Sequence, residues 1–157
     1  MQKPWNIPNL PVYSLVTYNQ GLLNMNICTY VSAISMQPKL FAIGVYNNTK
    51  TLENIEQSNV AVLQLLHQSH ANLVKKLGQT SGFNYNKQAY LNKKGILVEW
   101  NGLIILNDLS AVVMLNKIEA IQTGDHKLFV FEAIKHKSFN KDYLTLDFLR
   151  EKKIIRG

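Results

Sequence analysis

The chain has 157 residues, of which 46% are hydrophobic and 17% charged, with a formal net charge of +7. This composition excludes a disordered chain, and no stretch approaches the ~20 continuous apolar residues of a transmembrane helix. The basic residues form no run of five like charges and no nucleic-acid motif, so we expect a single domain over residues 1–157 with no nucleic-acid partner and no membrane association.

The first half of the chain alternates between strand-like runs and turns. Residues 12–18 are rich in β-branched and aromatic residues, which predicts a strand. A second strand is expected over residues 27–35, before Pro38, and a buried one over residues 40–46. A helix is then predicted to begin at Thr51, which is a suitable N-cap.

The second half continues this pattern with one polar interruption. Residues 60–66 predict a strand, Ser69 a helix cap and Gly78 the end of that helix. Residues 79–95 are rich in Asn, Lys and Gly, and we expect little regular structure there. The remaining expectations are a hairpin of residues 96–100 and 103–106 around Asn101-Gly102, strands over 110–122 and 128–134 joined by a turn, and a helix or strand within 143–155.

The count is about seven strands and two short helices. Short connections favour antiparallel pairing, and a closed barrel would remove the exposed edges of such a sheet. The lone Cys28 lies in an apolar run and is interpreted as a buried hydrophobe. His67 and His70 have no third ligand in sequence, so no metal site is expected.

Three segments carry a family resemblance by their order and spacing. They are Asn24–Leu40, Asn47–Ile55, and Gly124-Asp125-His126 followed by Leu128-Phe129-Val130, with Ser81-Gly82 as a fourth point of similarity. Together they resemble the flavin reductase family with the FMN-binding split β-barrel. The resemblance implies a mainly β fold, an antiparallel split β-barrel with a few short helices.

The turn before the predicted helix suits a phosphate. A helix N-terminus offers unpaired N–H donors and a positive dipole end. In the run Asn48, Thr49, Lys50 and Thr51, the two threonines would add hydroxyls and the lysine a charge. Without the other segments, an ordinary capped helix would be the better interpretation. With them, we expect these four residues to bind the phosphate of FMN.

The strand predicted over residues 27–35 suits a flat ring, because neither of its alternating faces is purely apolar. The resemblance implies that Thr29, Ser32, Ala33 and Ile34 line the flavin, partly through backbone groups. The alternative is a barrel strand that tolerates serines. FAD is an alternative cofactor to FMN.

The resemblance also places His126 near the reactive face of the flavin, where it would orient a nicotinamide or help to deliver a proton. An isolated Gly-Asp-His would instead be a surface turn. The sequence has no Gly-x-Gly-x-x-Gly fingerprint, so NAD(P)H would have to stack directly on bound flavin.

The predicted function is an NAD(P)H-dependent flavin reductase that transfers hydride from nicotinamide to flavin N5, with a monooxygenase as the candidate recipient of reduced flavin. The alternative is a non-enzymatic FMN-binding electron carrier that serves a protein partner, and a basic polyanion-binding module ranks below both. The resemblance implies a homodimer in which residues 83–85 and Tyr90 would cover a partner's flavin. Residues 1–5 lack a secretory apolar core, so we expect a cytoplasmic protein.

Overall fold

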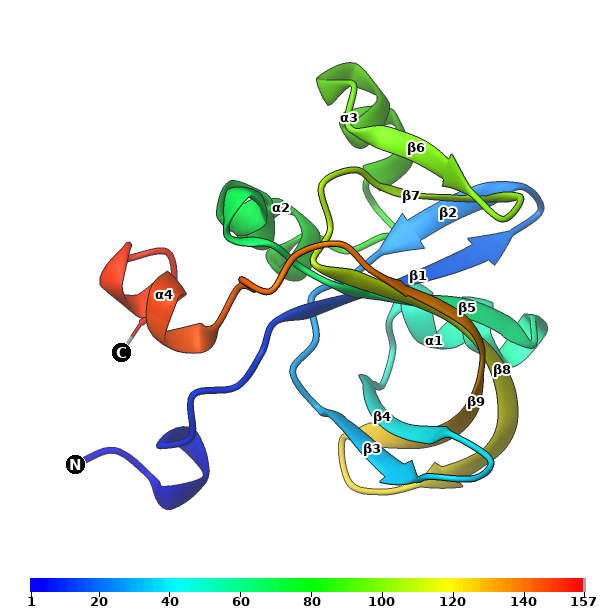
Figure 1. Ribbon diagram of the computed structural model, residues 1–157, viewed down its shortest axis with the longest axis horizontal. Helices are drawn as coiled ribbons and strands as arrows, with labels where there is room; N and C mark the ends of the chain where they lie inside the picture. Colours follow the sequence, from blue (N-terminus) through cyan, green and yellow to red (C-terminus); the bar gives the residue numbers. More distant parts are fainter. Residues whose placement is uncertain (157) are drawn as a thin grey trace.

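The computed structural model describes residues 1–156, and its main element is a curled antiparallel sheet (Figure 1). Within these residues the sheet has seven strands in the order β2-β1-β5-β8-β9-β4-β3, and a separate two-stranded ribbon pairs β6 with β7. The strands are β1 Tyr13–Asn19, β2 Leu22–Met25, β3 Val31–Ser35, β4 Leu40–Tyr46, β5 Val60–Leu65, β6 Leu97–Trp100, β7 Leu103–Leu106, β8 Ala111–Gln122 and β9 His126–Ser138. The architecture is therefore mainly β and antiparallel, as expected.

The sheet is not closed, unlike the closed barrel that the strand count favoured. β2 and β3 stand at the two ends of the strand order and do not pair with each other. The chain runs directly from one to the other through residues 26–30, which we call the seam. Within the seam Cys28 exchanges two backbone hydrogen bonds with Tyr13 at the start of β1, and Tyr30 O accepts one from Gly44 N on β4. The seam thus joins the two sheet edges without a continuous ladder.

Short helices cover the rest of the sheet. They are the 3₁₀ turns η1 Pro4–Asn6 and η2 Gln68–Leu73 and the α-helices α1 Lys50–Gln57, α2 Val74–Gln79, α3 Lys87–Lys94 and α4 Leu146–Glu151. The ambiguous C-terminal segment thus contains a helix. No helix among residues 1–156 combines the length and the apolarity needed to cross a bilayer.

Several helix boundaries differ from the sequence predictions. The N-cap of α1 is Thr49, not Thr51, because the Thr49 hydroxyl accepts from Leu52 N. The cap of η2 is His67 rather than Ser69, and α2 continues past Gly78 to Gln79. The expectation of little regular structure over residues 79–95 is wrong, because that segment contains α3.

Two apolar cores occupy the two faces of the central strands. Along β1, Leu15 packs inside the curled sheet with Phe129 and Phe131, whereas Val16 packs on the outer face with a cluster that includes residues of η2, α2 and α3. The central strands are therefore buried on both sides. β3, at the edge, is largely exposed, and the pocket described below lies along the seam that leads into it.

Candidate functional site

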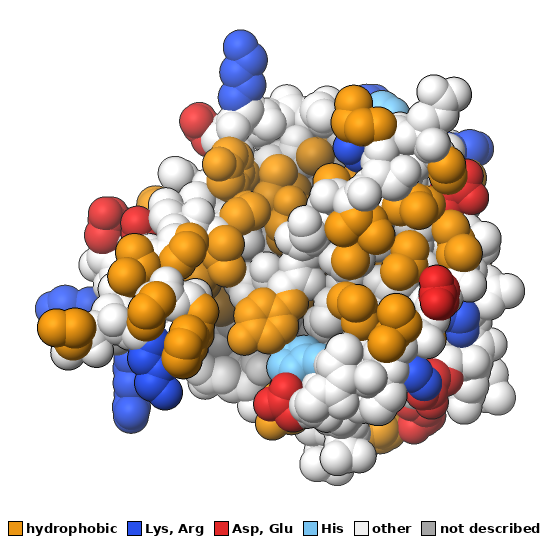
Figure 2. All heavy atoms as spheres, turned by 90° about the horizontal axis from the view of Figure 1, so that it is seen from below, with side chains coloured by type: hydrophobic (Ala, Val, Ile, Leu, Met, Phe, Trp, Pro, Cys, Tyr) orange, Lys and Arg blue, Asp and Glu red, His pale blue; other side chains and the backbone are white. Residues whose placement is uncertain are grey.

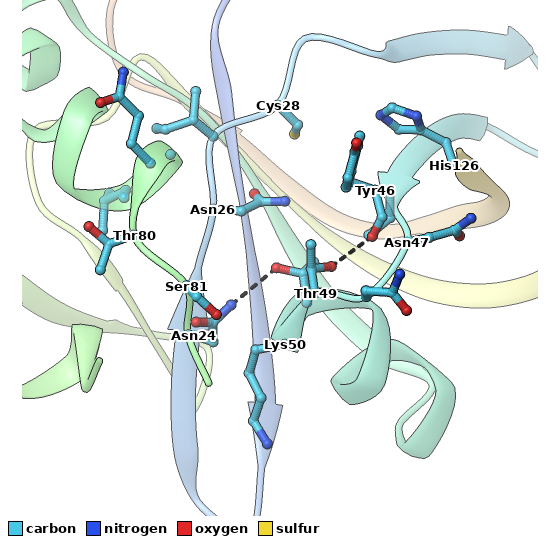
Figure 3. A pocket seen from close by; sticks show the side chains of 18 of the residues that line it. Asn24, Asn26, Cys28, Tyr46, Asn47, Thr49, Lys50, Thr80, Ser81 and His126 are labelled. Carbon is cyan, nitrogen blue, oxygen red and sulfur yellow. Dashed lines mark hydrogen bonds between the residues drawn. The ribbon is translucent and has the colours of Figure 1, made fainter. Parts of the chain in front are cut away.

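A pocket of about 610 Å³ lies where the seam, the end of β4, the start of α1 and the end of α2 meet (Figure 3). Its volume is within the ~300–1,000 Å³ range of sites for small molecules and cofactors. No Asp or Glu side chain lines it, whereas Lys50, Lys87 and His126 do. The pocket therefore favours a ligand with negative charge.

The turn into α1 supplies a row of free backbone donors. Asn48 adopts a left-handed conformation with φ +59°, and Thr49 follows as the N-cap. Among residues 1–156, no hydrogen-bond acceptor pairs with the backbone N–H of Asn48, Thr49, Lys50 or Thr51. Four consecutive donors at a helix N-terminus form an anion-binding site when they face a cavity.

Side-chain hydrogen bonds fix this turn in place. The Thr49 hydroxyl donates to Tyr46 O at 2.8 Å, and Asn24 Nδ2 donates to the buried Thr51 Oγ1 at 3.1 Å; Figure 3 draws both bonds. Gly82 packs against this corner so closely that an added Cβ would lie 2.8 Å from Lys50 Cβ and closer still to Asn24 Oδ1. This corner of the site is therefore closely packed and hydrogen-bonded without any ligand.

The two lysines of the pocket differ in how their charge is used. Lys50 Nζ lies 2.8 Å from Glu53 Oε1, so its charge is shared with a carboxylate. Lys87 is only 5% exposed and donates to the carbonyl oxygens of Met25 and Leu77 at 2.9 and 2.7 Å. Burial lowers the pKa of Lys87 to about 8.

The seam contributes a second set of free donors. Ile27, Thr29 and Tyr30 line the pocket, and their backbone N–H groups have no acceptor among the described residues. Asn26 Oδ1 accepts from Leu15 N at 2.8 Å and ties the start of the seam to β1. Such donors suit the hydrogen-bonding edge of a planar heterocycle.

His126 lies at the other side of the pocket from Lys50 (Figure 3). Its ring contacts Tyr30 and Tyr46, with centroid distances of 5.0 and 4.9 Å, and its Nδ1 is 2.6 Å from Asp125 Oδ1. These contacts hold the imidazole at one orientation. A second pocket of about 520 Å³ shares His126, Thr29, Tyr30 and Gly44 with the first.

The structure brings six of the nine predicted site residues to the first pocket. They are Thr29, Asn48, Thr49, Lys50, Thr51 and His126. Ser32 lines only the second pocket, and the exposed Ala33 and Ile34 line neither. Asn24, Asn26 and Lys87 line the pocket but were not predicted as site residues from the sequence. For Lys87, the sequence signal was Asn86, a suitable N-cap for a helix that begins at Lys87.

The remaining candidate nucleophile and ligands have structural roles. Cys28 lines the pocket, and burial raises the pKa of its thiol to about 12, so it is protonated at neutral pH. His70 Nδ1 accepts from His67 N at 3.1 Å, and its Nε2 donates to Asn107 O at 2.8 Å. Residues 1–156 contain no group of three His, Cys, Asp or Glu residues placed to hold a metal.

Solved structures with this architecture include flavin-binding proteins. An FMN-binding protein from Thermus thermophilus has a TM-score of 0.78 at 18% identity, covering 90% of this chain and 78% of that one. The flavin reductase PheA2 has a TM-score of 0.74 at 22% identity, covering 88% and 85%. An NADH:FAD oxidoreductase from Streptomyces globisporus, solved with NAD and FAD fragments, has a TM-score of 0.73 at 12% identity, covering 86% and 78%.

These likenesses confirm the fold as the FMN-binding split barrel. No curated protein matches the chain in sequence. The family model described as "Flavin reductase like domain" matches residues 9–152, which is nearly the whole chain. The chain therefore belongs to the flavin reductase like family, as the resemblance in its sequence indicated.

Proposed function

We propose that this protein binds FMN in the pocket along the seam and reduces it with NAD(P)H. The observation that carries the proposal is the row of four free backbone N–H groups at residues 48–51, which face a cavity lined by no carboxylate side chain. Family membership supports a flavin as the ligand. When bound, FMN would supply the ring atom N5 that accepts a hydride.

The chain's residues divide the binding between two sets of donors. The N–H groups of residues 48–51 and the hydroxyl of Thr51 would hold the phosphate, whereas the Thr49 hydroxyl already donates to Tyr46 O and fixes the turn. The free N–H groups of Ile27, Thr29 and Tyr30 would orient the polar edge of the ring. Ser32, Ala33 and Ile34 lie on β3, beyond the seam, and would contact the flavin from there.

His126 would act where the two pockets meet. A nicotinamide entering through the second pocket would contact the imidazole that Tyr30, Tyr46 and Asp125 hold in place. Hydride transfer needs close stacking rather than an enzymic acid or base, so His126 would orient the nicotinamide or deliver the accompanying proton.

The first test is the visible spectrum of the purified protein, with and without added FMN and FAD. The expected result is a bound-flavin spectrum, followed by oxidation of NADH or NADPH once flavin is present. Flavin-loaded protein that oxidises neither nucleotide would refute the reductase.

A non-enzymatic FMN-binding electron carrier is the second candidate, supported by the likeness to the FMN-binding protein of Thermus thermophilus. The variant His126→Ala separates the two. Loss of nicotinamide oxidation with retained FMN favours the reductase. Negligible oxidation by the wild type, with rapid reduction by a protein donor, favours the carrier.

We also propose that two copies of the chain pair, and that reduced flavin passes to a monooxygenase. Figure 2 shows apolar side chains gathered around a histidine on the face seen from below. Exposed hydrophobic residues near the seam and β3 include Tyr30, Ile34 and Met36, at 61%, 52% and 87% exposure. A patch of this kind favours association. Light scattering of the eluting protein should give twice the chain mass of 17.9 kDa.

A further inference from the structure

Lys87 is a buried cation that sits at the junction of two pockets. Its side chain lines both the main pocket and an adjoining one of about 450 Å³. An ammonium group has three N–H donors, and the protein accepts only two of them, through Met25 O and Leu77 O. One donor of a nearly fully buried charge is therefore left for a ligand.

This charge has no counter-ion within the part of the chain that the structure describes. No carboxylate lies within ion-pair distance of Lys87, and no Asp or Glu lines either of the two pockets. Lys50 lies nearer to the α1 N-terminus in sequence, but it is paired with Glu53 at 2.8 Å. An unpaired buried charge is costly, so a site that keeps one favours an anionic ligand.

Hydrogen bonds to adjacent residues of β2 link the Lys87 ammonium to the α1 N-terminus. The ammonium binds Met25 O, and the adjacent residue Asn24 binds the hydroxyl of Thr51 at 3.1 Å. Thr51 carries one of the four free N–H groups. The hydrogen bonds of Lys87 go to β2 and α2, whereas the ring of His126 contacts Tyr30 and Tyr46.

We propose that Lys87, rather than Lys50, supplies the positive charge that selects a phosphorylated flavin over an unphosphorylated one. The inference rests on the proposed flavin-binding function and extends it to a residue that the sequence analysis did not assign. The ligand class is a phosphomonoester, and the fixed donors of residues 48–51 would share its oxygens with the ammonium.

The protonation of Lys87 makes this selection dependent on pH. Burial alone lowers the pKa of Lys87 to about 8, whereas the phosphate stays doubly charged above pH ~6. The other titratable side chains on the packed elements are Cys28 and Tyr30 in the seam, Lys50, Glu53 and Glu56 on α1, Lys75 and Lys76 on α2, Tyr85 in the preceding loop and Tyr90, Lys93 and Lys94 on α3. None of them shifts the pKa of Lys87.

The test compares dissociation constants for FMN and riboflavin, which differ only in the phosphate. We expect Lys87→Met to weaken FMN binding at least tenfold more than riboflavin binding. Lys50→Met should change this ratio less. Lys117→Met is the matched control, because Lys117 also donates to a backbone carbonyl, Ile55 O, but lines neither pocket.

Three outcomes would overturn the inference. Equal weakening of both flavins by Lys87→Met would mean that the lysine only supports the fold, and a larger effect of Lys50→Met would assign the charge to Lys50. If Lys87→Met fails to fold, the pH dependence of flavin binding by the wild-type protein still tests the inference. Its preference for FMN should fall as the pH rises from 7 to 10, and a constant preference would overturn the inference.

The same titrations separate this inference from the proposed function. A wild-type protein that binds neither flavin refutes both. A wild-type protein that binds both, with a phosphate preference that Lys87→Met leaves intact, refutes only the role of Lys87. Inorganic phosphate should compete with FMN more strongly than with riboflavin, and equal competition counts against a phosphate subsite.

Discussion

Replacing Lys87 by Met should remove a gain in the free energy of unfolding that the ligand-free protein shows as the pH rises from 7 to 10. In the unfolded chain the lysine has its ordinary pKa of 10.5, whereas burial lowers the pKa in the folded protein to about 8. Between these values the folded state binds fewer protons, so the free energy of unfolding rises with pH. From pH 7 to 10 this gain amounts to about 2.5 kcal/mol, since each unit of pKa difference is worth about 1.4 kcal/mol and most of the difference between the two pKa values is crossed in this range.

The neutral amine keeps two N–H donors, which still satisfy Met25 O and Leu77 O, so deprotonation removes the cost of the buried charge without breaking either bond. The assay is urea denaturation of both proteins at pH 7, 8, 9 and 10. The stability difference, wild type minus Lys87→Met, should increase steadily over this range. Burial also raises the pKa of Tyr13 and Tyr18, but both proteins share that effect, which cancels. A flat or decreasing difference would refute the assignment of a charged, buried lysine.

Two further substitutions test the corner of the pocket at the start of α1. Thr49→Ala removes the N-cap and should lower the free energy of unfolding by about 1 kcal/mol in urea denaturation, whereas Thr49→Ser should restore it; equal stability of the Ala and Ser variants would argue against the cap. Gly82→Ala should cost about 1–3 kcal/mol and weaken FMN binding, because its Cβ would displace Asn24 and press on Lys50 Cβ. Gly124→Ala is the control, since its Cβ would have no neighbour within 4 Å, and similar losses in both variants would contradict the packing argument.

The sequence predicted strands well where a local signal, such as an apolar run or an Asn-Gly turn, determines the structure. The apolar run 40–46 is β4, and Asn101-Gly102 forms the expected hairpin turn because both residues adopt positive φ. β2 was missed because its four residues lack the flanking Asn-Gly signal that revealed the equally short β6 and β7. α3 was missed because it buries only Lys87 and Leu91, so it has no apolar periodicity, although Asn86 and Gly95 cap it.

The turn that we propose to bind phosphate could be predicted from the sequence because its residues are contiguous. Asn48, Thr49 and Thr51 act through the backbone of a helix start, which a local pattern can reveal. Lys87 could not be predicted, because its burial depends on contacts with Met25 and Leu77, which lie 62 and 10 residues away. The Lys50–Glu53 pair is local in sequence, yet only the structure reveals that it shares the expected charge.

The seam has a consequence for how the family can diverge. A strand flanked by partners along its full length uses its amides in ladders, but here the chain changes partner from β1 to β4 and leaves three amides unused. Main-chain groups survive the replacement of any side chain except by proline. A binding site built on main-chain groups therefore keeps its donors through most substitutions. Related proteins can then share such a site although few of the side chains around it are the same.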